Sequence, residues 1–361
     1  MDNKFNSPKE PKSNQNNKHN HHKQGFLESI HLMRGLAAAL VLIDHTFGWI
    51  DLGILSAVIA PIDGHGQVGV TIFFVISGFI LPYSMLSKYK LKHYTTFIAK
   101  RLIRLDPVYY VAILFSILLL YVKTRLSANG VPWELDWGQL FAHFLYFIPF
   151  TNYKWLNEAF WTLGIEFQFY LLLGLIFPLI KYAIREHSRL FCILSILLAI
   201  LALNLSALAA GIGFKIVPYL ALFILGILSF GYYIKWLKTS DFWVTSFLVV
   251  IIYSLSPAGD VSKSLVAAIS VLAIIFWQAP VIKLRFLGTI SYSLYVIHYP
   301  ITAFINGNVG KTLVEKGGIW SSIPWIFPMA SLSISLLAAW MMYLLIEVPT
   351  MKLAKKIRYQ S

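Results

Sequence analysis

Apolar runs recur along almost the whole of the 361-residue chain. Each run is close to the ~20 residues that an α-helix needs to cross the hydrocarbon core of a bilayer. The runs predict about ten transmembrane helices, at residues 32–50, 67–86, 105–122, 159–180, 190–209, 216–233, 242–256, 264–280, 289–306 and 324–346. The sequence therefore predicts an all-α integral membrane protein.

The polar segments at the two ends bound this membrane domain. Residues 1–25 are rich in Asn, Lys, Ser, Gln and His, with almost nothing apolar, so we expect a disordered basic tail. That tail leads directly into a full-length span, unlike a signal peptide. We expect one transmembrane domain over residues 26–350, followed by a short basic tail over 351–361. The aromatic segment 139–150 is too short to cross and is predicted to lie at the outer interface or to re-enter the membrane.

The basic residues test the number and direction of the spans, because Lys and Arg gather in cytoplasmic loops. Of the 30 Lys and Arg residues, 22 lie in alternate segments, which are the N-terminal tail, the loops 87–104, 181–189, 234–241 and 281–288, and the C-terminus. Both termini are therefore predicted to be cytoplasmic. The same rule and anionic lipid headgroups account for the net charge of +14, so we expect membrane lipids as partners and no nucleic acid.

Two features of the composition narrow the chemistry. Charged residues make up 13% of the chain, whereas a soluble domain carries roughly 25%. The single cysteine, Cys192, lies in an apolar run and excludes both a disulfide and a cysteine-based zinc site, so we expect a buried packing residue. No bound metal is expected.

The first span carries three titratable residues, Arg34, Asp44 and His45. A charge in the hydrocarbon costs roughly 2.5 to 3.5 kcal/mol on insertion scales, which makes such residues functional candidates. Arg34 and His45 are eleven residues apart and lie on one helical stripe, separated by a rise of ~16 Å. Asp44 points about 100° away from His45, so its partner is expected on a neighbouring helix. Two interpretations stay open: an anion-binding arginine with a catalytic imidazole, or a snorkelling arginine with a packing histidine.

A second basic cluster precedes Pro107. Arg101 and Arg104 are three residues apart and share a helix face at the predicted cytoplasmic surface. Two guanidinium groups there could hold the phosphates of a nucleotide-bearing donor. Ordinary positive-inside charge explains the cluster equally well.

Three further titratable residues lie within or beside later spans. Glu166 is about two turns into the fourth span, where a buried carboxylate is expected to pair with Arg or His or to act with one. His298 is similarly deep in the ninth span, and we favour a packing role for it. Glu347 precedes Pro349, and a structural salt bridge is expected there.

Six segments in this order resemble the signatures of the acyltransferase-3 family, membrane proteins that O-acylate bacterial surface polysaccharides. They are SIHLMRGLAAALVLIDHT, GVTIFFVISGFIL, KRLIRLDPVYY, WTLGIEFQFYLL, LGTISYSLYVIHYP and LLIEVP, and together they run almost from end to end. Two positions depart from the family pattern. Phe167 stands where the family often has a second Glu, and Asp106 stands where an apolar or aromatic residue is usual.

The resemblance implies roles for the candidate residues. His45 and Arg34 would carry the essential chemistry, and Arg101 and Arg104 would help to bind acyl-CoA. Glu166 would support the site. Asp44 and His298 are possible further supporting residues.

The resemblance also implies a reaction and a place for it. We expect an acyl group, with acetyl as the simplest choice, to move from cytoplasmic acetyl-CoA to a hydroxyl of an envelope or exported glycan or glycolipid. The donor would be a substrate rather than a permanently bound cofactor, and His45 would either deprotonate the acceptor or carry the acyl group. The expected location is the bacterial cytoplasmic membrane, where polysaccharide synthesis or export proteins could be partners.

Ten helices with intramembrane charges also fit other classes of protein. One alternative is a transporter or flippase for a glycan or a lipid-linked saccharide. Another is a structural partner in a polysaccharide synthesis complex.

Overall fold

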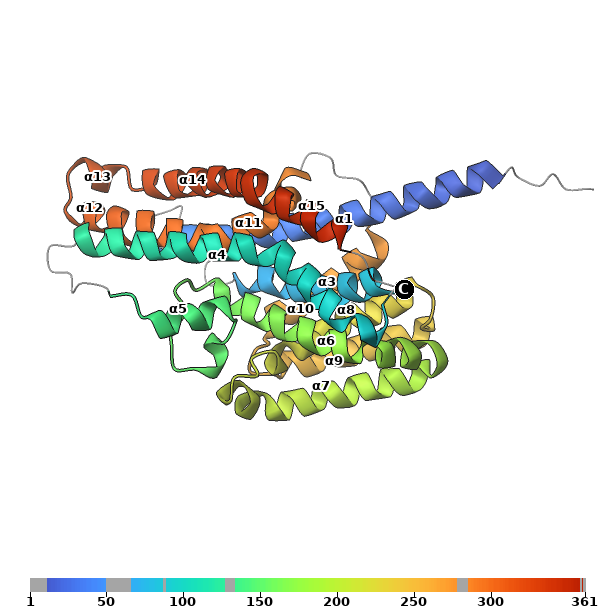
Figure 1. Ribbon diagram of the computed structural model, residues 1–361. Helices are drawn as coiled ribbons and strands as arrows, with labels where there is room; N and C mark the ends of the chain where they lie inside the picture. Colours follow the sequence, from blue (N-terminus) through green and yellow to red (C-terminus); the bar gives the residue numbers. More distant parts are fainter. Residues whose placement is uncertain are drawn as a thin grey trace, which may run out of the picture.

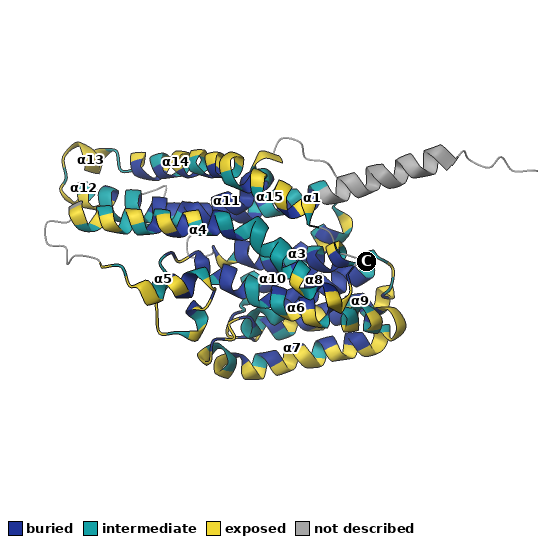
Figure 2. Ribbon diagram, viewed as in Figure 1, coloured by how far each residue is buried: buried dark blue, intermediate teal, exposed yellow. Residues whose placement is uncertain are grey.

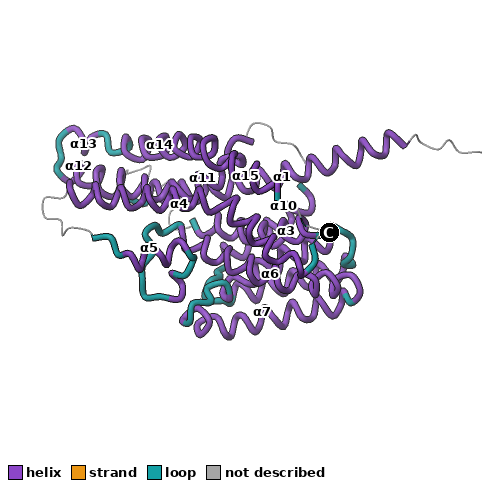
Figure 3. Tube along the Cα trace, viewed as in Figure 1, coloured by secondary structure: helices purple, strands orange, loops and turns teal. Residues whose placement is uncertain are grey.

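The computed structural model describes residues 12–49, 66–86, 89–126, 134–277, 285–357 and 359, and leaves aside the side chains of residues 12–27 and 126. Over these ranges the chain forms helices and loops without a strand (Figure 3). The all-α prediction is therefore confirmed for the described part of the chain.

The helices follow one another along the chain with short connections. The α-helices are α1 (Lys12–Phe47), α3 (Gln67–Met85), α4 (Tyr94–Leu126), α5 (Trp137–Phe144), α6 (Phe160–Glu186), α7 (Ser188–Gly211), α8 (Leu220–Tyr233), α9 (Thr239–Ser254), α10 (Val261–Phe276), α11 (Arg285–Thr302), α12 (Lys311–Glu315), α13 (Ile319–Ser322), α14 (Ile326–Met342) and α15 (Val348–Lys356). Short 3-10 turns are η1 (Leu91–His93), η2 (Ile148–Phe150) and η3 (Val217–Tyr219). Two π-helical segments, η5 (Ala303–Gly310) and η6 (Tyr343–Glu347), extend α11 and α14.

In the described part of the chain, each of the segments predicted to span the membrane contains a helix. Within the described residues, six helical stretches are long and apolar enough to cross a bilayer, and three shorter apolar helices of 10–17 residues lie at Val217–Tyr233, Thr239–Ser254 and Val261–Phe276. The remaining predicted span falls on α11, which is more polar and is buried along most of its length. A helix enclosed by other helices can carry polar groups that lipid would not tolerate.

Several helices begin or end away from the predicted bounds. α1 begins at Lys12, so its backbone includes residues 12–25, which the composition predicted as a disordered tail. α4 begins at Tyr94 rather than near residue 105, because its first turns carry charged side chains that a span prediction leaves out. The last span continues through η6 into α15.

α11 is buried among neighbouring helices along most of its length. It packs against α1, α14 and α4, while α3 packs against α8 and α1 (Figure 1). α1 and α11 approach closely, since a Cβ atom on Gly35 would meet the backbone of Leu287 and Gly288. The outward faces of α7 and α14 are exposed and apolar, as expected of surfaces that meet lipid (Figure 2).

The aromatic segment 139–150 and Cys192 were the subject of two further predictions. The aromatic segment 139–150 forms the short α5 and η2, with Phe141 and Phe147 more than half exposed. Cys192 is buried, as predicted. The segments 51–65 and 127–133, which belong to the predicted outer loops, lie outside the described residues.

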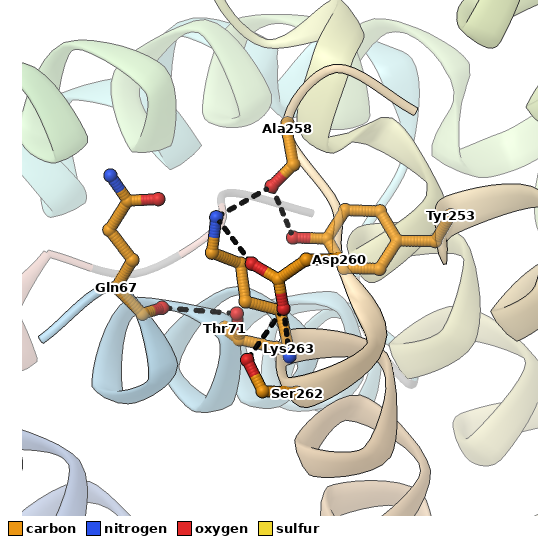
Figure 4. A network of polar contacts seen from close by, with 7 residues as sticks. All are labelled: Gln67, Thr71, Tyr253, Ala258, Asp260, Ser262 and Lys263. Atoms are coloured by element: carbon orange, nitrogen blue, oxygen red, sulfur yellow. Dashed lines mark hydrogen bonds and ion pairs between the residues drawn. The ribbon is translucent and has the colours of Figure 1, made fainter. Parts of the chain in front are cut away.

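A polar network joins the start of α10 to the loop after α9 (Figure 4). Asp260 caps α10 by accepting from the Lys263 backbone N–H at 2.8 Å and from Ser262 at 2.6 Å, and it pairs with Lys263 Nζ at 3.1 Å. Burial raises the pKa of this carboxyl, but these hydrogen bonds and the lysine charge outweigh burial and lower the pKa of Asp260 to about 2. Lys263 Nζ and the Tyr253 hydroxyl both donate to the Ala258 carbonyl oxygen, at 3.2 and 3.3 Å, so the network ties the start of α10 to the loop after α9.

Candidate active site

A cavity of about 320 Å³ lies among α1, α3, α4, α6 and α11. Four of the predicted site residues line it, namely Arg34, Arg101, Arg104 and Glu166. They come from three helices that are far apart in the sequence. The structure therefore brings Arg34 of the first predicted span together with Arg101 and Arg104 at one site.

The three arginines carry more positive charge than Glu166, the carboxylate among the described lining residues, can neutralise. In the described part of the chain, no ion pair joins Arg34, Arg101 or Arg104 to a carboxylate. Arg101 Nη2 donates to Ser84 Oγ at 3.1 Å, and its guanidinium lies 5.6 Å from the ring centre of Phe97. The Nε atom of Arg104 is buried without a hydrogen-bond partner. The cavity thus presents unused cationic donors, which suit an anionic ligand.

Glu166 supplies the carboxylate of the cavity. It accepts hydrogen bonds from Ser77 Oγ at 3.3 Å and from the Tyr170 hydroxyl. No hydrogen bond between Glu166 and an imidazole is found among the described residues, so its charge acts on the arginines rather than on His45.

His45 and His298 form a hydrogen-bonded pair between α1 and α11. The Nδ1 atom of His45 lies 2.9 Å from Nε2 of His298, and Nδ1 of His298 lies 3.0 Å from the carbonyl oxygen of Leu294. The two rings are nearly parallel, at 7°. His298 is 1% exposed, whereas the side chain of His45 is 26% exposed.

Asp44 lies closer to His45 than the helical geometry predicted. Its Oδ2 atom is 3.7 Å from Nε2 of His45, so the expectation that Asp44 points away and pairs with another helix is wrong. Adjacent side chains can approach each other because rotation about χ1 and χ2 swings both groups toward the end of the helix. Gly66, which packs against the Asp44 side chain, leaves the room for this arrangement.

The pair formed by His45 and His298 lies beside the cavity but does not line it. Among the described lining residues are Tyr295 and Phe73, whose rings are in contact, while His45 and His298 are not among them. Tyr295 also packs on His298, with ring centres 5.9 Å apart, and its hydroxyl lies 2.7 Å from Thr162 Oγ1. Arg34 and His45 were predicted to share one face of the first helix. In the structure, the side chains of Tyr295 and Phe73 lie between the cavity that Arg34 lines and the histidine pair.

Two other titratable residues, Glu347 and Asp106, have structural partners. Glu347 accepts from Ser293 Oγ at 2.7 Å, and the predicted salt bridge is not present among the described residues. Glu347 faces α11, where its hydrogen-bond partner is the hydroxyl of Ser293 rather than the cationic side chain that was expected. Asp106 accepts from Tyr146 at 2.9 Å and from Tyr110 at 3.2 Å, which explains how a carboxylate fits at a position expected to be apolar.

Sequence reasoning did not identify some of the residues around the cavity. His31 lines it and bonds Thr289 at 3.1 Å, and its spacing of three residues from Arg34 was a usable signal. Ser77 and Tyr292 line it too, but a serine or tyrosine in an apolar helix carries no distinctive pattern. No cluster of potential metal ligands occurs in the described residues.

A second cavity, of about 310 Å³, lies at the start of α6 and the end of α7. Trp155, Trp161 and Tyr219 line it together with Lys215. The rings of Trp161 and Tyr219 are 5.5 Å apart. This cavity is separated from the first by α6, on which Trp161 and Thr162 face different cavities.

Comparison with known proteins identifies the family. A family model described as an acyltransferase domain, the acyltransferase-3 family, matches residues 27–344. Nodulation protein 10 of Rhizobium leguminosarum bv. viciae is 25% identical over 378 residues, covering 92% of this chain and 95% of that protein. Putative peptidoglycan O-acetyltransferase YrhL of Bacillus subtilis (strain 168) is 26% identical over 200 residues, covering 52% of this chain and 29% of that protein. No solved structure gives a significant match.

The matched region includes the cavity and the histidine pair. Among the described residues it also includes five of the six long apolar stretches in full and the first part of the sixth, Ile326–Lys356. Because this match covers most of the chain, the protein belongs to the acyltransferase-3 family and is a multi-pass membrane acyltransferase.

Proposed function

We propose that this enzyme transfers an acetyl group from cytoplasmic acetyl-CoA to a hydroxyl of an envelope or exported glycan, within the bacterial cytoplasmic membrane. The observation that carries the donor assignment is the cavity lined by Arg34, Arg101 and Arg104 with one carboxylate, Glu166. Guanidinium groups bind phosphate through paired, charge-assisted hydrogen bonds, and CoA carries several phosphate oxygens. The transporter or flippase alternative is less favoured, because the chain belongs to an acyltransferase family.

The proposed direction of the reaction rests on the topology predicted from charge. Ten crossings with both termini in the cytoplasm would put the first turns of α4 and the Arg34 end of α1 on the donor side. In agreement with an even number of crossings, the start of α1 and α15 lie toward the same side of the bundle (Figure 1). His45 would then lie nearer the outer surface.

In this proposal Arg101, Arg104 and Arg34 hold the donor, and Glu166 limits the excess positive charge. His45 either deprotonates the acceptor hydroxyl or carries the acetyl group. The acetyl end of the donor must pass Tyr295 and Phe73 to reach His45, so we propose that these rings move when the donor binds.

The acceptor is proposed to approach from the side of the second cavity. Its aromatic wall of Trp155, Trp161 and Tyr219 suits the apolar faces of sugar rings, and Lys215 offers a charged donor. One relative carries the name of a peptidoglycan O-acetyltransferase, which supports a glycan as the acceptor. Glu158, which interacts electrostatically with His45, lies three residues ahead of Trp161.

Donor binding can be tested with the purified full-length protein in lipid nanodiscs. Acetyl-CoA and CoA are expected to raise the midpoint of thermal unfolding, whereas pantetheine, which lacks the nucleotide and its phosphates, should have little effect. Arg101→Ala should weaken CoA binding by roughly 10- to 100-fold, the equivalent of one charge-assisted hydrogen bond of about 1.5–3 kcal/mol.

The matched control is Arg185→Ala, since Arg185 is exposed and pairs with Glu186 away from the cavity. Its affinity for CoA should equal that of the wild type. Equal stabilisation by CoA and pantetheine, or equal loss in both variants, would contradict the proposed donor site. The transfer itself can be tested by measuring acetylated glycan in cells. It should be present in cells that express the wild-type enzyme and absent from cells that express His45→Ala.

A further inference from the structure

The contact between His45 and His298 determines which ring nitrogen of His45 can react. This inference rests on the proposed function, because it concerns the histidine assigned there to the reaction. It starts from His298, whose two ring nitrogens both have identified partners, the Leu294 carbonyl oxygen and His45.

The partner of Nδ1 of His298 fixes the tautomer of that ring. A carbonyl oxygen can only accept a hydrogen bond, so Nδ1 of His298 carries the proton that points to Leu294, at 3.0 Å. His298 is 1% exposed, and no carboxylate among the described residues lies within ion-pair distance of it. A charged ring would be a buried cation without a counterion, which is costly. His298 is therefore neutral, and its Nε2 atom is an acceptor.

The tautomer of His45 follows from that of His298. Because Nε2 of His298 accepts, Nδ1 of His45 must donate across the 2.9 Å contact. The neutral imidazole of His45 then has its lone pair on Nε2. This atom faces Asp44 at 3.7 Å, so a proton that arrives on Nε2 forms an ion pair with a carboxylate.

We infer that His298 is a positioning residue that holds His45 in the tautomer with a free Nε2, and that Nε2 of His45 acts as the general base. The acceptor hydroxyl gives its proton to Nε2 while its oxygen attacks the thioester carbonyl and forms the new C–O bond. The C–S bond of acetyl-CoA breaks, and the departing thiolate takes the proton back from His45. The products are the acetyl ester and CoA with a free thiol, and His45 is neutral again.

The same contact disfavours one form of an acetylated His45, the neutral acetylimidazole. A neutral acetylimidazole with the acetyl group on Nε2 needs Nδ1 without its proton. The group in contact with Nδ1 is His298. If His298 took that proton it would become a cation in a site without a carboxylate partner, so the contact makes a neutral acetylimidazole costly.

Two substitutions at His298 separate positioning from packing. His298→Gln places an amide oxygen near the position of Nε2 and keeps an acceptor for His45. His298→Asn keeps a group near Nδ1, toward Leu294, and removes that acceptor. We expect kcat to fall by about 100-fold for Asn and by less than about 10-fold for Gln, within the range for loss of a correctly held general base. The KM for acetyl-CoA should change by less than about 2-fold in both variants, since His298 does not line the donor cavity.

The matched control is His143, another buried histidine with one bond to a backbone carbonyl, Gln139, at 2.8 Å and one from a backbone N–H, Leu156, at 3.1 Å. His143→Asn removes the equivalent acceptor away from the cavity, and kcat per folded molecule should stay within about 2-fold of the wild type. If the Asn and Gln variants of His298 are equally active, or if Asn is the more active, the positioning role is wrong.

A measurement on the unaltered enzyme covers the case in which the His298 variants do not fold. Nitrogen-15 NMR of protein labelled at histidine distinguishes protonated from unprotonated ring nitrogens, and the His45→Ala spectrum assigns the signals of His45. We expect a protonated Nδ1 and an unprotonated Nε2, and the opposite tautomer would overturn the inference. Full activity of His45→Ala would instead contradict the proposed function, so the two failures are distinguishable.

Discussion

At the scale of single residues, Arg104 has an unsatisfied hydrogen-bond donor beside the cavity proposed to bind the acyl donor. Its Nε atom is buried without a partner, and Arg34 and Arg101 line the same space. An unpartnered buried donor costs about 1–3 kcal/mol. A bound phosphate group that accepts from this guanidinium would offset that cost and reduce the repulsion among the arginines, so Arg104 is expected to contribute to binding an anionic ligand.

Arg104→Ala is therefore expected to raise the KM for acetyl-CoA by about 10- to 100-fold. Arg104→Lys should restore only part of the affinity, because lysine keeps the charge but lacks the planar pair of donors. Steady-state transfer assays with increasing acetyl-CoA measure both effects. Full recovery with lysine would mean that the site needs charge alone.

Glu166 gives a different residue-scale prediction. Because it bonds Ser77 and Tyr170 rather than an imidazole, Glu166→Gln should keep both donors satisfied and make the cavity more positive. We expect the KM for acetyl-CoA to fall or stay unchanged and kcat to drop by less than about 10-fold. A loss of about 100-fold in kcat at unchanged KM would indicate a direct role in holding the base.

At the scale of elements, the α1–α11 interface carries the proposed reaction groups. Arg34 and His45 lie on α1, and His298 lies on α11. The two helices approach closely at Gly35 and Gly288, where a Cβ atom on Gly288 would meet the backbone and ring of His31. Small residues at this crossing therefore allow the close packing of the two helices that carry the imidazoles.

Gly288→Ala should destabilise the enzyme by about 1–3 kcal/mol through overpacking, and should also lower kcat because it moves α11 away from α1. Thermal unfolding in nanodiscs and transfer assays on the same preparation measure the two effects. The control is Gly211→Ala, where nothing lies within 4 Å of the added atom. A Gly288→Ala enzyme with unchanged stability would contradict the close packing.

The cap of α10 gives a second prediction at this scale, with a defined pH dependence. Asp260→Ala removes the cap and should cost about 1 kcal/mol near neutral pH. The folded-state pKa of Asp260, about 2, is below its unfolded value of roughly 3.9, so the carboxylate stabilises the fold above the unfolded value and this contribution is lost as pH falls toward 2. The difference between wild type and variant in thermal unfolding should shrink over that window. A difference that persists at pH 2 would indicate another cause.

At the scale of the whole molecule, the predicted topology can be tested with cysteines, because Cys192 is the single cysteine and is buried. In a Cys192→Ser background, Lys316→Cys should react with a membrane-impermeant maleimide added to intact cells. Lys356→Cys should react only after the cells are opened. Both positions are exposed, so a failure to react reflects the side of the membrane rather than burial.

The positions of the helices could be predicted well from the sequence, because a long apolar segment in a bilayer satisfies its backbone hydrogen bonds as an α-helix. Their ends were predicted poorly, as at Tyr94, because the charges of Arg101 and Arg104 face a cavity and do not stop the helix. The meeting of three arginines from α1 and α4 depends on tertiary packing, which no local pattern contains. The approach of Asp44 to His45 depends on side-chain rotation, which helical periodicity does not describe.

The wall formed by Phe73, Tyr295 and Thr162 has a consequence for the energised cell. The arginine chamber lies on one side of these side chains and the imidazole pair on the other. A continuous wet passage at this place would let protons and small ions leak down the electrochemical gradient each time the donor dissociates. In the proposed reaction, side chains that separate only around the bound donor would let cytoplasmic acetyl-CoA react with an acceptor on the outer side while the membrane potential is kept.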